Sequence, residues 1–151
     1  MKTLSNMFRV SSYISLIGWI TLFCLPSWQY SQTVVMGVTV TLLCAVYSYL
    51  IFFGKRHDEP GLKVKGNFWS LRGVIGLFKS PRFVLAGWVH YLAFDLVAGL
   101  FIVSNAAHYN IPHGMLIPCL FVTLMFGPAG LLLYLLLRFF MTHDYMVVNF
   151  F

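Results

Sequence analysis

Apolar residues run almost without interruption through four stretches of the chain, and polar residues are concentrated between them. The stretches cover residues 10–28, 33–53, 83–105 and 114–138. Each is long enough to cross the hydrocarbon core of a bilayer, which takes roughly 20 residues in a helix. The pattern predicts an all-α membrane protein with four transmembrane helices, forming a single integral membrane domain over residues 1–151.

Composition agrees with this pattern. Of the 151 residues, 60% are hydrophobic and 9% are charged, whereas soluble globular domains average about 25% charged residues. The four stretches use up most of the chain, so no room remains for a soluble catalytic domain. Any chemistry must therefore lie within the helical bundle or at its faces.

The first apolar stretch has some features of a secretory signal, because Lys2 and Arg9 precede it. A signal peptide ends in small residues at its cleavage site, but this stretch is followed by Pro26, Trp28 and Tyr30. We therefore expect it to be a retained span that forms a helical hairpin with the second stretch.

The basic residues predict the orientation. All ten Lys and Arg residues precede the first stretch, lie in the loop of residues 54–82, or end the fourth stretch at Arg138. The loops on the other side contain none. By the positive-inside rule, both termini and the loop 54–82 are predicted to be cytoplasmic. The chain is expected to be a multi-pass protein of the cell membrane, and the lack of a plastid transit peptide favours a bacterial-type membrane.

The loop 54–82 contains a second kind of pattern. Five apolar residues of the segment FWSLRGVIGLFKSP recur at helical spacing: Phe68, Leu71, Val74, Ile75 and Phe78. Arg72 and Lys79 lie off this stripe, and Trp69 suits the level of the lipid headgroups. The pattern predicts a short amphipathic interfacial helix between the second and third spans, which Pro81 separates from the third span.

The net charge of +6 does not indicate a nucleic-acid partner. The basic residues are juxtamembrane, and no aromatic and basic platform is present on which bases would stack. Membrane lipids with anionic headgroups are the expected partners. Membrane topology alone explains most of the charge without a specific lipid site.

The cysteines and histidines do not predict a metal or cofactor site. Cys24, Cys44 and Cys119 lie in apolar runs without Cys-x-x-Cys spacing, and we interpret them as small buried hydrophobic residues. A bridge between Cys24 and Cys119 is conceivable at their similar depth. A haem held by two histidines needs them on facing helices, but the first two stretches contain none. No metal and no cofactor are therefore expected.

The third stretch carries two ionisable residues, His90 and Asp95, within WVHYLAFDLVAG. A carboxylate at mid-bilayer costs about 2.5 to 3.5 kcal/mol on insertion scales, so Asp95 should face the bundle interior and find a partner. No Lys or Arg lies at its depth. The side chains at that depth that can donate a hydrogen bond are those of Trp19, Thr21, Thr39, Thr41 and Thr123.

His90 and Asp95 should face different neighbours. Five helical residues separate them by roughly 7.5 Å along the axis and about 140° around it. Asp95 shares its stripe with Trp88, Tyr91 and Gly99, whereas His90 shares one with Phe94. At the depth of His90 lie Ser15, Tyr47 and Tyr134. Both residues could line one pocket from different edges, or simply form structural hydrogen bonds between helices.

The fourth stretch contains the segment MFGPAG. Gly127 and Pro128 should kink the helix, because proline lacks a backbone donor and crowds the preceding turn. Gly127 and Gly130 would also let a neighbouring helix approach closely. Such a helix can shape a cavity or serve tight packing alone.

Two segments together carry a resemblance to a known family. GVIGLFKSPRFVLAGWVHYLAFDLVAG, followed by IPHGMLIPCLFVTLMFGPAGLLLYLLLR, resembles the small four-helix membrane family typified by the plant abscisic-acid-deficient protein needed for neoxanthin formation. The first hairpin is similar in length and in Gly18, Trp19, Leu22 and Pro26. The resemblance implies a role in carotenoid metabolism, with an epoxy-xanthophyll rearranged or isomerised to an allenic one.

The resemblance also suggests site residues. The expected catalytic residues are Asp95 and His90. The expected residues around a carotenoid or other apolar polyene are Trp88, Tyr91, Phe94, Gly99, Phe126, Gly127, Pro128 and Trp19. One departure concerns Leu100 and Phe101, where members of the family often have an Arg-Trp pair.

The residues are compatible with such chemistry. Asp95 in its neutral form could protonate an epoxide oxygen, and its conjugate carboxylate or His90 could then remove a proton. An alternative is a lipid- or pigment-binding scaffold without chemistry. A third is a small proton-linked transporter built on Asp95, which the lack of detectable inverted repeats or discontinuous spans disfavours. The glycines permit a homo-oligomer without requiring one.

Overall fold

The computed structural model describes residues 2–58 and 66–143, which form helices and loops without strands. Four helical segments are long and apolar enough to cross a membrane, which confirms the all-α membrane class. They are α1 (Lys2–Cys24), η1 (Thr33–Val40) with α2 (Thr41–Phe52), α4 (Pro81–His108) and α5 (His113–Thr142). The turn η2 (Gly54–His57) and the short helix α3 (Leu71–Leu77) lie between α2 and α4.

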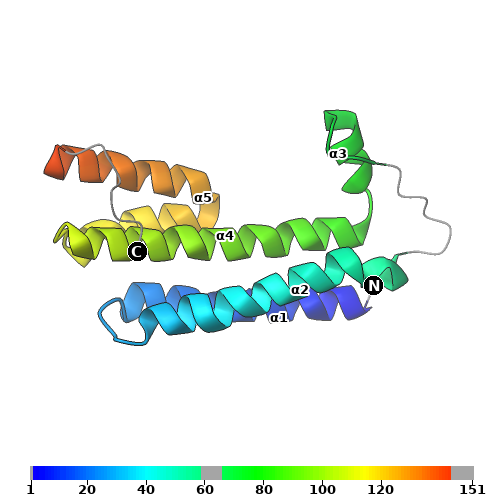
Figure 1. Cartoon of the computed structure of the whole chain (residues 1–151), viewed down its shortest axis with the longest axis horizontal. Coiled ribbons are helices and arrows are strands. Elements are labelled where there is room, and N and C mark those ends of the chain that lie inside the picture. Colours follow the sequence, from blue (N-terminus) through cyan, green and yellow to red (C-terminus); the bar gives the residue numbers. More distant parts are fainter. Residues whose placement is uncertain (1, 59–65, 144–151) are drawn as a thin grey trace.

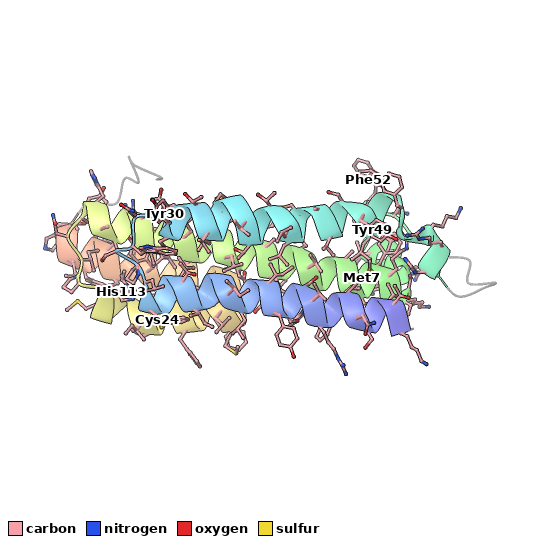
Figure 2. The ribbon with its side chains drawn as sticks, turned by 90° about the horizontal axis from the view of Figure 1, so that it is seen from below. Met7, Cys24, Tyr30, Tyr49, Phe52 and His113 are labelled. Carbon is pink, nitrogen blue, oxygen red and sulfur yellow. The ribbon has the colours of Figure 1, made fainter. Side chains whose placement is uncertain are left out.

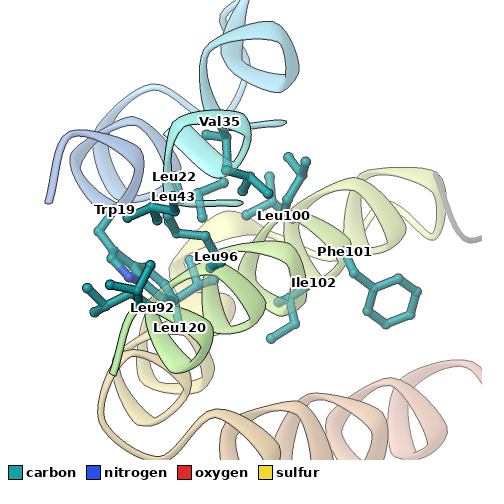
Figure 3. Close-up of a cluster of buried hydrophobic side chains, with 14 of the residues drawn as sticks. Trp19, Leu22, Val35, Leu43, Leu92, Leu96, Leu100, Phe101, Ile102 and Leu120 are labelled. Carbon is teal, nitrogen blue, oxygen red and sulfur yellow. The ribbon is translucent and has the colours of Figure 1, made fainter. Parts of the chain in front are cut away.

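Helix α4 is the centre of the bundle. It packs against α1 and the η1–α2 segment on one side and against α5 on the other (Figure 1). Figure 3 shows Trp19 and Leu22 of α1 approaching Leu96 and Leu100 of α4. Because lipid tails are as apolar as these side chains, close van der Waals packing must supply most of the cohesion between the helices.

Two glycines allow α1 and α4 to cross closely. A Cβ atom at Gly18 would lie 2.8 Å from a methyl carbon of Leu96, and one at Gly99 would lie 3.0 Å from the Trp19 ring. Any larger side chain at either position would push the helices apart. Gly99 and Trp19, both expected at a polyene site, are thus part of this helix packing.

Helix α5 is broken in its middle. Phe126 (φ −142°, ψ 36°) and Gly127 (φ 14°, ψ −82°) leave the helical region, which confirms the predicted kink at Gly127 and Pro128. The chain also reverses there, so that the halves before and after the break run side by side in opposite directions (Figure 1). A Cβ atom at Gly130 would overlap Thr123, which shows how closely the two halves approach.

The reversal carries the second half of α5 back to the end of α4. The Tyr134 hydroxyl donates to the Asn105 side-chain oxygen at 2.6 Å, and Arg138 lies 3.4 Å from the same oxygen. The Arg138 guanidinium also lies over the Tyr109 ring, 5.1 Å from its centre. These contacts with the end of α4 hold the second half of α5 in its reversed direction.

The reversal of α5 changes where the end of this helix lies. The start of α1 and the end of α5 lie at opposite ends of the bundle (Figure 1). The described end of α5 therefore does not lie beside the start of α1, as one straight span over residues 114–138 would place it. The side of the membrane on which each terminus lies stays a prediction. A Gly-Pro pair indicates where a helix breaks, but the angle at the break depends on what each half packs against.

We call the end that holds the starts of α1 and α4 the basic end. Met7, Tyr49 and Phe52 lie near it, whereas Cys24, Tyr30 and His113 lie near the opposite end, which we call the far end (Figure 2). At the far end, His113 Nε2 lies 3.0 Å from the Phe23 carbonyl oxygen and so connects the end of α1 to the start of α5.

Arg82 is buried at the basic end, although the sequence placed it among the loop cations. Its guanidinium lies 3.0 Å from the Asp58 carboxylate and donates to the carbonyl oxygens of Leu50 at 3.0 Å and Ile51 at 3.3 Å. These carbonyls end α2 and lack partners within the helix. Arg82 therefore joins α2, the segment after η2 and the start of α4, where Pro81 is the first residue as expected.

The predicted short helix between the second and third spans is present as α3. The Ser70 side chain caps it by accepting a hydrogen bond from the Gly73 amide at 3.1 Å. The helix stands away from the bundle at the basic end (Figure 1), and Trp69 beside it is 95% exposed. Its location in a membrane interface stays a prediction.

Candidate functional site

Asp95 faces the break in α5. It is 14 residues after Pro81, about 21 Å along α4, which is close to the helix middle. The side chain is buried, and its Oδ2 atom has no hydrogen-bond partner among the described residues. A Cβ atom at Gly127 would overlap the Asp95 carboxyl group, so only glycine allows this approach.

Tyr91 is the polar neighbour of Asp95, one helical turn earlier. Its hydroxyl group interacts with the Asp95 carboxyl and lies 3.0 Å from the Leu124 carbonyl oxygen and 2.8 Å from that of Met125. The break removes the helical partners of such carbonyls. Tyr91 therefore satisfies the end of the first half of α5, in the apolar interior where an unpaired carbonyl is costly.

Together, Tyr91, Asp95 and Gly127 form what we call the helix-break site. Pro128 starts the second half of α5, where its missing N–H group leaves no donor unsatisfied. Helix ends that meet inside a membrane present partial charges to whatever binds there. The site thus combines a buried carboxyl with a hydroxyl and with the backbone ends of a discontinuous helix.

The hydrogen-bond donors predicted for Asp95 are used elsewhere. The hydroxyls of Thr21, Thr39 and Thr123 donate to the carbonyl oxygen four residues earlier in their own helices, at 2.9, 2.6 and 2.7 Å. Thr41 similarly bonds to Met36 at 3.0 Å. Threonine in a helix commonly makes this local bond. The four threonines expected as partners of Asp95 therefore bond within their own helices. The polar neighbour observed is Tyr91, which the sequence places on the same stripe of α4 as Asp95.

His90 lies on a different face of α4, as its spacing from Asp95 predicted. Its ring centre is 4.5 Å from that of Phe94 and 5.7 Å from that of Tyr47 on α2. The expected contact with Tyr47 is confirmed. The expected proximity to Tyr134 is wrong, because the reversal of α5 carries Tyr134 to Asn105. The cavity that His90 lines does not include Asp95 among its lining residues.

A groove lies between the helix-break site and the basic end, on the surface of α1 and α4. The Trp88 ring lies 5.5 Å from the rings of both Tyr91 and Phe8. Beyond it, α1 and α4 enclose about 360 Å³, which we call the α1–α4 groove. Its lining residues are Leu4, Ser5, Phe8, Pro81, Val84, Leu85 and Trp88. Because α5 turns back at Gly127, it does not extend along the half of α4 that leads to the basic end (Figure 1).

The structure brings only some of the expected ligand-binding residues together. Trp88, Tyr91 and Gly127 lie at the site or groove, whereas Phe94 lies beside His90. Phe126 is 68% exposed, and Pro128 is exposed beside it at the break. Phe8 and Val84 were not predicted, since spacing along one helix does not identify contacts from another.

The described residues offer no group of three His, Cys, Asp or Glu side chains that could hold a metal ion. Cys24, Cys44 and Cys119 are all free thiols. Cys119 is buried as expected, but Cys24 and Cys44 are on the outer surface of the bundle. The conceivable bridge between Cys24 and Cys119 is therefore not formed.

Comparison with known proteins identifies the family. The family model described as ABA DEFICIENT 4-like matches residues 6–134, a range that includes most of α1, all of α4 and the break in α5. No curated protein and no solved structure matches the chain. The family implies a role in the carotenoid and abscisic acid pathway. The chain, which has four helices apolar enough to span a membrane, therefore belongs to the ABA DEFICIENT 4-like family.

Proposed function

We propose that the protein binds a xanthophyll in the α1–α4 groove and isomerises its epoxide end group at Asp95. The observation that carries the proposal is the buried carboxyl of Asp95, with Oδ2 unpaired, about two helical turns along α4 from Trp88 in the apolar groove. A buried acid without a cation costs free energy in a bundle and is by default a functional-site candidate. Membership in the family directs the choice of substrate class.

The groove suits a rigid polyene. Its walls include Phe8 and Trp88, which offer flat apolar surface without many rotatable bonds. From Val84 to Asp95 the face of α4 extends roughly 17 Å, long enough for part of a polyene to lie along it. In this arrangement the epoxide ring is at the helix-break site and the chain extends toward the basic end.

Asp95 supplies both proton transfers of the proposed reaction. The neutral carboxyl donates its proton to the epoxide oxygen, one carbon–oxygen bond breaks, and a hydroxyl group forms. The carboxylate left behind then removes a proton from the polyene carbon next to the ring, whose electron pair forms the new double bond of the allene. Substrate and product have the same atoms, so the cycle needs no oxidant, reductant or cofactor.

His90 is left out of this mechanism, because it faces Tyr47 and Phe94 rather than the groove. Tyr91 acts as a positioning residue, since its hydroxyl joins the Asp95 carboxyl to the carbonyls at the break. The two-residue scheme expected from the sequence is thus replaced by a single carboxyl with a supporting phenol.

Turnover in proteoliposomes containing an epoxy-xanthophyll tests this proposal. Chromatography should show an allenic product with the wild type and at least a hundredfold slower conversion with Asp95→Asn, which keeps size but cannot exchange the proton. Tyr13→Phe, a similarly small change at an exposed side chain of α1, should convert at close to the wild-type rate. Equal rates for Asp95→Asn and wild type would exclude Asp95 as the acid.

Proton-linked transport is a second candidate, and one observation now favours it. The sequence disfavoured a transporter because no discontinuous span was detected, but α5 is discontinuous at a buried carboxyl. A pH-sensitive dye inside the same proteoliposomes discriminates between the two functions. Substrate-dependent proton movement with unchanged pigment would indicate transport, whereas conversion without proton movement would indicate the isomerase. Bound but unchanged pigment without proton movement would indicate the scaffold.

A further inference from the structure

A second cavity lies at the basic end, between α2, α3 and α4. It encloses about 230 Å³ and opens on the face of α4 that carries His90, away from the helix-break site. Its lining residues are Tyr47, Ile51, Phe68, Leu77, Phe78, Phe83, Ala86, Gly87 and His90. We call it the α2–α4 cavity. The proposed isomerisation makes no use of it.

Helix α3 and its flanking residues form the outer wall of this cavity. Phe68, Leu77 and Phe78 come from this short segment, which stands apart from the bundle at the basic end (Figure 1). The opposite wall comes from α2 and α4 and includes Ile51 and Ala86. With apolar residues on both sides, the cavity favours a hydrocarbon chain over water or a polar solute.

The end of the molecule at which the cavity lies is basic. Exposed Lys and Arg residues gather at this end of the molecule: Lys2, Lys55, Arg56, Arg72 and Lys79. Lys79 directly follows the lining residue Phe78, and Lys55 lies one helical turn after Ile51. Among the described residues, Asp58 is the acid at this end, and Arg82 already binds it. This end therefore has an excess of positive charge.

We propose that the α2–α4 cavity binds one acyl chain of an anionic phospholipid from the surrounding membrane, with the headgroup held by Lys79 and neighbouring cations. An apolar cavity at the basic end matches an amphiphile with a hydrocarbon chain and a negative head. A xanthophyll has no negative group for these cations to select. The site is therefore distinct in chemistry and position from the α1–α4 groove.

Native mass spectrometry of the full chain tests this proposal. The protein is reconstituted in nanodiscs of equal parts phosphatidylglycerol and phosphatidylcholine, and the lipids retained after release are counted. The wild type should retain one phosphatidylglycerol in preference to phosphatidylcholine. Lys79→Ala should reduce this preference about fivefold, since one cation near an anionic surface is worth about that factor. Lys2→Ala, at the same end but on α1, should change the preference less than twofold.

Filling the cavity provides an independent readout. A Cβ atom at Gly87 would already lie 3.0 Å from the Phe78 ring, so Gly87→Leu should occupy the space and abolish retention. Gly114→Leu, where a Cβ atom would meet nothing within 4 Å, is the matched control and should retain the lipid. Equal retention of the two lipids by the wild type, or an unchanged preference in Lys79→Ala, would overturn the proposal. The Lys79 variant alters an exposed side chain and leaves the fold intact.

Discussion

Asp95 can be buried because its neighbours provide both room and polarity. Gly127 leaves space for the carboxyl where any Cβ atom would overlap it, and Tyr91 places a hydroxyl beside it. Neither neighbour supplies a positive charge. An Arg or Lys partner would hold the carboxylate in its charged form, and the helix-break site contains neither.

The close approach at Gly127 predicts a strong effect of a single methyl group. Gly127→Ala should lower the free energy of unfolding by about 1 to 3 kcal/mol, because the methyl group forces α5 and the Asp95 carboxyl apart. Thermal unfolding in detergent measures the change. Gly114→Ala, in open space on the same helix, should have a midpoint close to that of the wild type. If Gly127→Ala unfolded at the same midpoint temperature as the wild type, the close contact between Gly127 and the Asp95 carboxyl group would be contradicted.

Tyr91 gives a prediction about the hydroxyl group alone. Tyr91→Phe should lower the stability by about 1 kcal/mol, because the freed carbonyls of Leu124 and Met125 lose a donor in the membrane interior. Tyr13→Phe, at a side chain 67% exposed, should have little effect. Equal unfolding midpoints for the two variants would show that Tyr91 does not cap the break.

At the scale of residues, helical spacing predicted what one helix can reveal. The stripe of Trp88, Tyr91 and Asp95, and its separation from His90, follow from geometry along α4 alone. The contacts of Phe8 with Trp88, and of Tyr91 with the Leu124 carbonyl, depend on how two helices are placed relative to each other. The helical spacing of residues along the sequence does not indicate how two helices are placed.

At the scale of elements, the reversal of α5 is the main departure from expectation. The sequence identifies the break through Gly127 and Pro128 and permits close approach at Gly130. It does not specify that Gly130 packs against Thr123 of the same helix, or that Tyr134 reaches Asn105. Arg138, which the sequence placed beside the other cations, is buried against Asn105 and Tyr109 at the far end.

Cysteine labelling with a membrane-impermeant reagent tests the reversal. In a variant lacking the three native cysteines, Thr142→Cys and Asn110→Cys should be labelled from the same side of the membrane, and Lys55→Cys from the opposite side. This follows because the end of α5 lies next to the end of α4. Labelling of Thr142→Cys together with Lys55→Cys would mean that α5 crosses the membrane once.

Arg82 gives a prediction about how α2 and α4 are joined. Arg82→Ala should destabilise the protein by about 3 to 5 kcal/mol, because Asp58 and the carbonyls at the end of α2 lose their shared partner. Arg72→Ala removes an exposed guanidinium nearby and should change stability by less than about 0.5 kcal/mol. Similar losses in the two variants would argue against the buried role of Arg82.

At the scale of the whole molecule, the two ends of the bundle differ in how much of α4 is covered by α5. Toward the far end, both halves of α5 cover α4, but beyond the break they leave α4 and α1 open on one side (Figure 1). Composition and the four apolar stretches predicted the membrane class. The groove arises from the reversal, so a sequence read as four straight spans could not predict it.

The pigment that co-purifies with the protein tests the central claim most directly. The protein is purified from cells that make epoxy-xanthophylls, and its visible spectrum is recorded before the pigment is extracted and separated by chromatography. We expect a polyene spectrum from the wild type and an allenic product in the extract. Phe8→Ala with Trp88→Ala should lose most of the pigment, whereas Tyr13→Ala on the exposed side of α1 should keep it. A colourless wild-type protein, or pigment bound equally by the groove variant, would contradict the account.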